Sequence, residues 1–259
     1  MTDPRRNIRI MGIFNANRDS FFAPSRYNMS ILESGADIID VGAVSTRPGA
    51  AEVSGEEEWS RLEPVLRALA DSTAEISVDT TRAAVVERSC DVLGRPVIVN
   101  DISAGEDDPD MLRTAARLGL TYIAMHKRGT PPTMQSLCGY GDVVEEVLDY
   151  FRDFAVKASD AGIEDWILDP GFGFAKDVRQ NYTLLDSLDS FSVLGRPLLV
   201  GISRKSFIYK PLGLSPEESL PATQALHLAA LERGADILRV HDVPAAREAV
   251  SLYRLLHGV

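Results

Sequence analysis

Polar side chains that could bind or activate a small molecule follow short apolar runs of the sequence. Asp79, Asn100 and Asp169 each close one such run, and Lys205 and Arg239 stand at or just after two more. A carboxylate accepts two parallel N–H bonds from an amidine-like edge, and Arg and Lys side chains hold phosphate groups. The set therefore predicts a site for a phosphorylated, nitrogen-rich small molecule. Because no Ser or Cys lies in a recognisable nucleophile motif, the predicted chemistry is electrostatic stabilisation of a leaving group.

The apolar runs recur eight times and alternate with helical stretches. They lack strict polar alternation, as is typical of parallel strands buried on both faces. The runs cover residues 8–14, 38–44, 76–78, 96–99, 122–125, 166–168, 197–202 and 236–240. Eight strand–helix units in 259 residues give about 32 residues each. This spacing predicts an α/β fold, a (β/α)8 TIM barrel forming a single domain over residues 1–259, with a doubly wound open sheet as the alternative.

The carboxyl ends of barrel strands meet at one rim, where the active sites of this fold lie. The cations expected to hold phosphate groups at this rim are Arg47, Arg204, Lys205, Arg239 and His241. Some acidic residues nearby also have structural interpretations: Asp101 and Asp242 fit helix N-caps, and Asp40 fits a buried structural hydrogen bond. Such interpretations do not explain why every strand end carries a polar group.

Composition excludes several classes of function. The chain has 27 Lys and Arg against 38 Asp and Glu, a net charge of −11, which argues against a nucleic-acid binder. No apolar run approaches the roughly 18 residues of a membrane helix, and the start has no signal-peptide pattern. Cys90 and Cys138 form no metal-type spacing and are expected to be reduced thiols in a cytoplasmic protein.

Motifs across nearly the whole chain resemble those of the dihydropteroate synthase family, in the family's order. The specific ones are STRPG at 45–49, MHKRGTP at 125–131, DPGFGF at 169–174, SRKS at 203–206 and RVHD at 239–242. IMGIFN at 10–15, GADIIDVG at 35–42, SVDT at 77–80 and VNDIS at 99–103 add to the match. The resemblance implies a pterin-binding barrel of folate biosynthesis. It further implies condensation of 6-hydroxymethyl-7,8-dihydropterin diphosphate with 4-aminobenzoate, assisted by Mg²⁺, in an enzyme that is usually a homodimer.

The resemblance also implies roles for individual residues. Asp79, Asn100 and Asp169 would hold the pterin, and Asn15 would ligate Mg²⁺ near the diphosphate. Lys205 would bridge the pterin and the 4-aminobenzoate region, so Asp79, Asp169 and Lys205 are the expected catalytic residues. The residues expected around the other substrate groups are Phe174 and Ser206 for 4-aminobenzoate, and Thr46, Arg47, Arg239 and His241 for the diphosphate and its loops.

The first loop departs from the family pattern. The family's Thr-Pro is Asn17-Arg18 here, which removes a proline that stiffens the loop over the diphosphate and 4-aminobenzoate sites. Val44 stands where the family has an acidic residue. The altered loop leaves open a pterin-binding paralogue without condensing activity. A methyltransferase that uses a reduced pterin in a similar barrel is a separate alternative.

Overall fold

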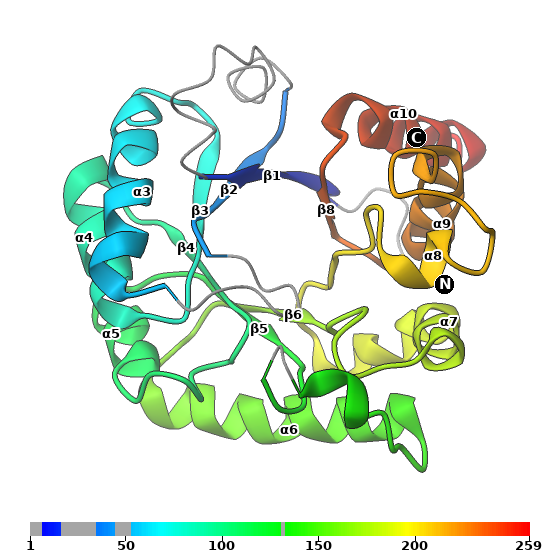
Figure 1. The fold of residues 1–259 in the computed structure, drawn as a ribbon, viewed down its shortest axis with the longest axis horizontal. Coiled ribbons are helices and arrows are strands. Elements are labelled where there is room, and N and C mark those ends of the chain that lie inside the picture. Colours follow the sequence, from blue (N-terminus) through cyan, green and yellow to red (C-terminus); the bar gives the residue numbers. More distant parts are fainter. Residues whose placement is uncertain (1–6, 17–34, 45–52, 131–132) are drawn as a thin grey trace.

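Eight parallel strands form a nearly closed barrel with helices around its outside (Figure 1). The structure is a computed structural model, and it describes residues 7–16, 35–44, 53–130 and 133–259. The strands are β1 Arg9–Asn15, β2 Ile38–Gly42, β3 Glu75–Asp79, β4 Ile98–Asp101, β5 Tyr122–Met125, β6 Trp166–Asp169, β7 Leu199–Val200 and β8 Ile237–Val240. Their order is β6-β5-β4-β3-β2-β1-β8-β7, and a parallel bridge between Leu168 and Leu198 joins the two ends. The (β/α)8 prediction is confirmed, and the open-sheet alternative is wrong.

Helices connect successive strands from β2 onward and cover the barrel. They are α3 Gly55–Ala68, α4 Ala83–Leu93, α5 Met111–Arg117, α6 Val143–Ala161, α7 Val178–Asp186, α8 Ser206–Tyr209, α9 Leu220–Glu232 and α10 Val243–Leu256, with 3-10 turns η1 Met134–Ser136 and η2 Leu188–Leu194. Helix α3 is N-capped by Ser54 and continues through Pro64. Burial of Trp59, Leu62 and Leu66 against the core offsets the hydrogen bond that proline cannot donate.

Strand β7 is much shorter than its apolar run suggests. The run at 197–202 predicts six residues, but only Leu199–Val200 pair as a strand. The backbone N–H of Leu198 donates to the Asp236 carboxylate at 2.9 Å, and Gly201 leads directly into the loop that carries Lys205. At this end of the strand a side-chain carboxylate accepts from the Leu198 N–H, while the Leu198 carbonyl still accepts from the backbone N–H groups of Asp236 and Ile237.

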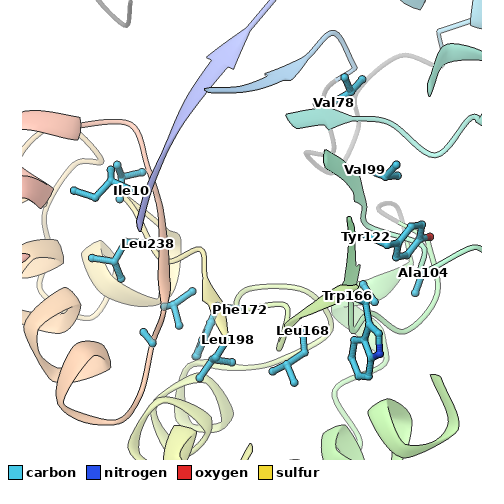
Figure 2. Close-up of a cluster of buried hydrophobic side chains, with 14 of the residues drawn as sticks. Ile10, Val78, Val99, Ala104, Tyr122, Trp166, Leu168, Phe172, Leu198 and Leu238 are labelled. Carbon is cyan, nitrogen blue, oxygen red and sulfur yellow. The ribbon is translucent and has the colours of Figure 1, made fainter. Parts of the chain in front are cut away.

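The barrel wall has one apolar layer on its outside and one on its inside, because successive strand residues point to opposite faces. Outward side chains pack against the helices; Figure 2 shows Ile10 and Leu238 on the neighbouring strands β1 and β8, and Leu168 beside Leu198 at the closure. Inward side chains fill the lower barrel. This inner cluster comprises Met11, Ile38, Ile98, Ile123, Ile167, Leu199 and Ile237, all at most 4% exposed. This inner cluster forms an apolar plug toward the amino ends of the strands. The open end of the barrel is the rim formed by the carboxyl ends of the strands.

Among the helices that the structure describes, none has the length and apolar character needed to cross a bilayer.

Candidate active site

Four alternate strands repeat one pattern: isoleucine, any residue, polar residue. The pattern falls at 38–40, 98–100, 167–169 and 237–239. The isoleucines belong to the inner apolar cluster, and residues two apart on a strand share a face. Barrel interiors are built from layers of four side chains contributed by alternate strands. The layer directly above the isoleucines therefore consists of Asp40, Asn100, Asp169 and Arg239, which we call the polar layer.

Arg239 lies at the centre of the polar layer's charges. Its Nε donates to Asp40 Oδ2 at 2.7 Å, and its Nη2 donates to Asp79 Oδ2 at 2.7 Å. Burial alone would lower the pKa of this guanidinium, but the Asp40 and Asp79 carboxylates raise it above its ordinary value. Arg239 thus stays charged and holds carboxylates from β2 and β3 together.

Asn100 joins β4 to this network. Its Nδ2 donates to the two carboxylate oxygens of Asp40, at 3.2 and 3.1 Å. Asn100 is 4% exposed and Asp40 is 1% exposed. The buried structural hydrogen bond expected for Asp40 is present, and its partners are two of the residues expected to bind substrate.

Asp79 lies on β3 in register with Asn100 and one position above the buried Val78. Burial raises the pKa of the Asp79 carboxyl to about 7, Arg239 opposes this, and the negative charge of Asp40 adds to it. One guanidinium faces two carboxylates, so one negative charge is left to be offset by a proton or by a ligand.

Asp169 and Lys205 form the opposite side of the site. Asp169 Oδ1 accepts from the Gly171 N–H at 2.8 Å, while burial raises the pKa of the carboxyl. Lys205 Nζ donates to the Phe172 carbonyl and lies 4.8 Å from the centre of the Phe174 ring. Burial lowers the pKa of Lys205 to about 8, and Asp169 opposes the shift.

The loop between β6 and α7 is held from beneath by Lys176. Its Nζ lies 2.9 Å from His126 Nδ1 and donates to the carbonyls of Gly171 and Phe174, at 3.0 and 3.1 Å. Burial lowers the pKa of His126 to about 2, so the ring is neutral and can accept this bond. Burial also lowers the pKa of Lys176 to about 7. The pair fixes the segment that positions Phe174 and the acceptor of Lys205.

The loops after β7 and β8 are tied to each other by two pairs of side chains. Arg204 forms a two-pronged ion pair with Asp242, both bonds 2.7 Å, and its Nη1 donates to the carbonyls of Pro216 and Glu217. His241 Nδ1 lies 3.0 Å from Ser203 Oγ. Arg204 is expected to help hold phosphate at this rim; in the structure its guanidinium joins two loops, and a contact with phosphate stays a prediction.

The structure brings together most of the predicted site residues and separates a few. Asp79, Asn100, Asp169, Lys205 and Arg239 converge on the barrel mouth through the contacts above. Asn15, Ser206 and His241 are exposed at strand or loop ends around it, and Phe174 is half-buried. Thr46, Arg47, Asn17 and Arg18 lie outside the described residues.

The N-cap interpretation is wrong for Asp101, whereas Asp242 does occupy the N-cap position of α10. Asp101 accepts from the N–H groups of Ser103 and Gly105 and from the Tyr122 hydroxyl, so it holds a turn. Asp242 precedes α10 without a side-chain capping bond and pairs with Arg204 instead.

Sequence reasoning did not assign Asp40, His126 or Lys176 to the site. The repeated isoleucine-x-polar pattern could have placed Asp40 in the same layer as Asn100, Asp169 and Arg239. Nothing comparable in the sequence indicates the pairing of His126 with Lys176, because 50 residues separate them.

Comparison with known proteins agrees with this geometry. A sequence model of the family described as "Pterin binding enzyme" matches residues 11–241. The dihydropteroate synthase of Escherichia coli (strain K12) is 44% identical over 253 residues, which cover 93% of this chain and 89% of that one. The corresponding protein of a Synechocystis strain is 43% identical over 249 residues, covering 91% and 86%.

Solved structures give the same result. The Yersinia pestis dihydropteroate synthase in a sulfonamide drug complex superposes with a TM-score of 0.90 at 37% identity, covering 99% of this chain and 96% of that one. The Xanthomonas albilineans dihydropteroate synthase with 4-aminobenzoic acid superposes with a TM-score of 0.88 at 36% identity, covering 99% and 95%. The chain therefore belongs to the dihydropteroate synthase family of pterin-binding transferases, enzymes of folate biosynthesis.

Proposed function

We propose that the mouth of this barrel carries out the family's reaction through Asp79, Asn100, Asp169, Lys205 and Arg239. As a dihydropteroate synthase, the chain joins 6-hydroxymethyl-7,8-dihydropterin diphosphate to 4-aminobenzoate and releases 7,8-dihydropteroate and diphosphate. The observation that carries the residue assignment is the convergence of these five side chains above the apolar plug.

The pterin lies among Asp79, Asn100 and Asp169 in this proposal. Their oxygens accept from the N–H groups of the heterocycle, and Lys205 donates from the side of Phe174. Catalysis is SN1-like. The carbon–oxygen bond to the diphosphate breaks with both electrons on the leaving oxygen, and a pterin methyl cation remains. The carboxylates of Asp79 and Asp169 stabilise this cation, and Lys205 orients the ring beside them.

The second substrate enters from the rim. 4-Aminobenzoate lies beside Phe174, Ser206 and Lys205, and its amine nitrogen attacks the cation and then loses a proton. Thr46, Arg47, Arg239 and His241 hold the diphosphate or order the loops around it. Arg239 already forms ion pairs with Asp40 and Asp79. These pairs support a role in which Arg239 orders the site as well as binding the diphosphate.

Mg²⁺ fits the donor set at Asn15. In the described part of the chain, no group of three His, Cys, Asp or Glu side chains could enclose a metal. Mg²⁺ commonly keeps several waters and binds through one or two protein oxygens plus substrate phosphates. The exposed Asn15 carboxamide at the end of β1 offers such an oxygen. When bound there, the ion would neutralise charge on the leaving diphosphate.

The remaining assignments concern the chain as a whole. We propose a single domain over residues 1–259, a homodimer, and a cytoplasmic location. Neither Cys90 nor Cys138 is in a disulfide in the described part of the chain, which supports a reducing compartment. The net charge of −11 supports small-molecule partners and opposes nucleic acid.

The test is a product assay on the purified chain with Mg²⁺ present. Dihydropteroate should form only when the pterin diphosphate and 4-aminobenzoate are both supplied, with one diphosphate released per product. Tight pterin binding without product would support the paralogue that Asn17 and Arg18 leave open. Methyl transfer from methyltetrahydrofolate would support the third alternative and contradict the proposal.

A further inference from the structure

Asp40 is the member of the polar layer to which no contact with substrate has been assigned. It lies on β2, is 1% exposed, and has two charged or polar partners. Arg239 Nε donates to it at 2.7 Å, and Asn100 Nδ2 donates to it at 3.1 and 3.2 Å. A carboxylate in this position neutralises Arg239. Its hydrogen bond with Asn100 has a second effect, on the orientation of the Asn100 carboxamide.

The bond fixes which way the Asn100 carboxamide faces. An ionised carboxylate only accepts hydrogen bonds, whereas a carboxamide carries a donor nitrogen and an acceptor oxygen. Asn100 must therefore turn Nδ2 toward Asp40. The two groups of a planar carboxamide point to different sides, so Oδ1 faces away from Asp40. In the described part of the chain, this oxygen accepts no hydrogen bond.

We propose that Asp40 is a positioning residue that locks the Asn100 carboxamide with its oxygen toward the barrel mouth, so that the site selects a heterocycle presenting an N–H donor there. The inference rests on the proposed function in that Asn100 contacts the ligand. It adds a residue and a physical origin for selectivity. Without Asp40, Asn100 could present either its donor or its acceptor.

The neighbouring groups agree with this polarity. Asp169 and Asp79 also present carboxylate oxygens, while the donors Lys205 and Arg239 come from β7–α8 and β8. An Asn100 oxygen adds a third acceptor to those of Asp79 and Asp169. An Asn100 amino group would oppose a ligand N–H and leave both donors unpaired, which is costly in a buried site.

The experiment measures discrimination between two ligands by calorimetry on the full-length protein. The probes are pterin and lumazine, the analogue whose ring amino group is replaced by a carbonyl oxygen. The wild type should prefer pterin. Asp40→Asn lets position 40 donate as well as accept, so Asn100 can turn over, and the preference should fall about tenfold.

Exchanging the side chains at positions 40 and 100 should restore the preference for pterin over lumazine. In the double variant Asp40→Asn, Asn100→Asp, the amide donates to the carboxylate and position 100 again presents only an acceptor. The ligand preference should return to within about threefold of the wild type, while Asn100→Asp alone sets two carboxylates together and weakens pterin binding. Asp37→Asn is the matched control: Asp37 immediately precedes β2 and pairs with Arg247, at the end of the barrel opposite to the mouth. It should leave the preference unchanged.

Two outcomes would overturn the inference: an unchanged preference in folded Asp40→Asn, or a folded double variant no more selective than Asp40→Asn. Should Asp40→Asn fail to fold by circular dichroism, the comparison of Asn100→Asp with the double variant decides. The second substitution must then restore pterin binding, and failure to do so counts against the inference. A wild type that binds neither probe would instead contradict the proposed function.

Discussion

Asp79 has a pKa close to the working pH of most enzymes because it is buried among other carboxylates. Burial raises the pKa to about 7, so the group becomes neutral as the pH falls below that value. A neutral carboxyl cannot stabilise the pterin cation. We expect kcat/KM to fall toward acid pH with a midpoint near 7, approaching tenfold per pH unit, because a single protonation is involved.

The measurement is the pH profile of kcat/KM for the wild type and for Asp79→Asn. The variant should be slower at every pH and should lack the acid limb. An acid limb that persists at the same midpoint in Asp79→Asn would assign the proton to another group.

Lys205 and Asp169 should be required for turnover but not for folding. Both lie at the barrel mouth, above the apolar plug that carries the packing. Lys205→Ala or Asp169→Ala should therefore reduce product formation to background while the circular dichroism spectrum stays that of the wild type. Loss of the fold in either variant would mean that the residue is structural. Burial lowers the pKa of Lys205 to about 8, so the wild-type rate should also decline above that pH.

The sequence identified these side chains because each stands at the end of an apolar run. It predicted a buried hydrogen bond for Asp40 but not its partners, and it did not predict that Arg204 pairs with Asp242, since partner choice depends on which strands become neighbours. Arg204 and Asp242 are 38 residues apart, and the pairing of β7 with β8 brings them within 2.7 Å. Asp40 lies inside its run rather than at its end, so its place in the polar layer depends on the barrel's stagger.

The turn after β6 tolerates no side chain at Gly171. Its φ is +69°, and a Cβ built there would lie 2.0 Å from the His126 carbonyl oxygen. Gly119 is a matched control: its φ is +62°, but nothing lies within 4 Å of an added Cβ. Gly119→Ala should cost only the left-handed backbone penalty, about 1–2 kcal/mol of unfolding free energy.

Gly171→Ala should cost that penalty plus about 1–3 kcal/mol for the forced overlap, or displace the loop. Because the same loop carries Phe174 and the carbonyl that accepts from Lys205, activity should fall with stability. The two variants are compared by chemical denaturation and by the product assay. Equal losses of stability in both would show that the loop can move away from His126 without cost.

Strand positions followed from the sequence more closely than strand lengths. The apolar run at 122–125 coincides with β5, whereas the run at 197–202 contains only two strand residues. Apolar character records burial, and residues around β7 are buried by loops as well as by the ladder: Leu198 and Ile202 are at most 4% exposed outside the strand. Burial and backbone pairing into a strand are separate properties, and an apolar run in the sequence indicates only burial.

The distribution of charge over the whole molecule differs from its sum. The chain is acidic overall at −11, yet several cations near the strand ends are neutralised within the protein. Lys127 pairs with Asp107, Arg128 with Glu146 and Arg204 with Asp242. At the mouth, Arg239 is paired with Asp40 and Asp79, and Lys205 faces Asp169. Binding of a diphosphate therefore depends on the local arrangement of a few charges rather than on the net charge of the chain.

The barrel should unfold as one unit rather than as two half-barrels. Its possible halves, β1–β4 and β5–β8, are paired at both seams: β4 with β5 over three residue pairs, and β8 with β1 over four. The least paired junction, the single bridge between β6 and β7, lies within one half. Separation into halves would break two ladders and expose the shared apolar plug.

The two tryptophans report on different halves, since Trp59 lies in α3 and Trp166 in β6. We expect the variants Trp59→Phe and Trp166→Phe, each with one tryptophan left, to give fluorescence transitions in urea that coincide with far-UV circular dichroism measured on the same variant. Each substitution shifts the midpoint by its own loss of packing, so the comparison is between probes within one variant. If fluorescence and circular dichroism separate in opposite directions in the two variants, the halves unfold independently. The barrel would then be an assembly of two folding units, because the ladders at its seams would not be enough to couple the two halves.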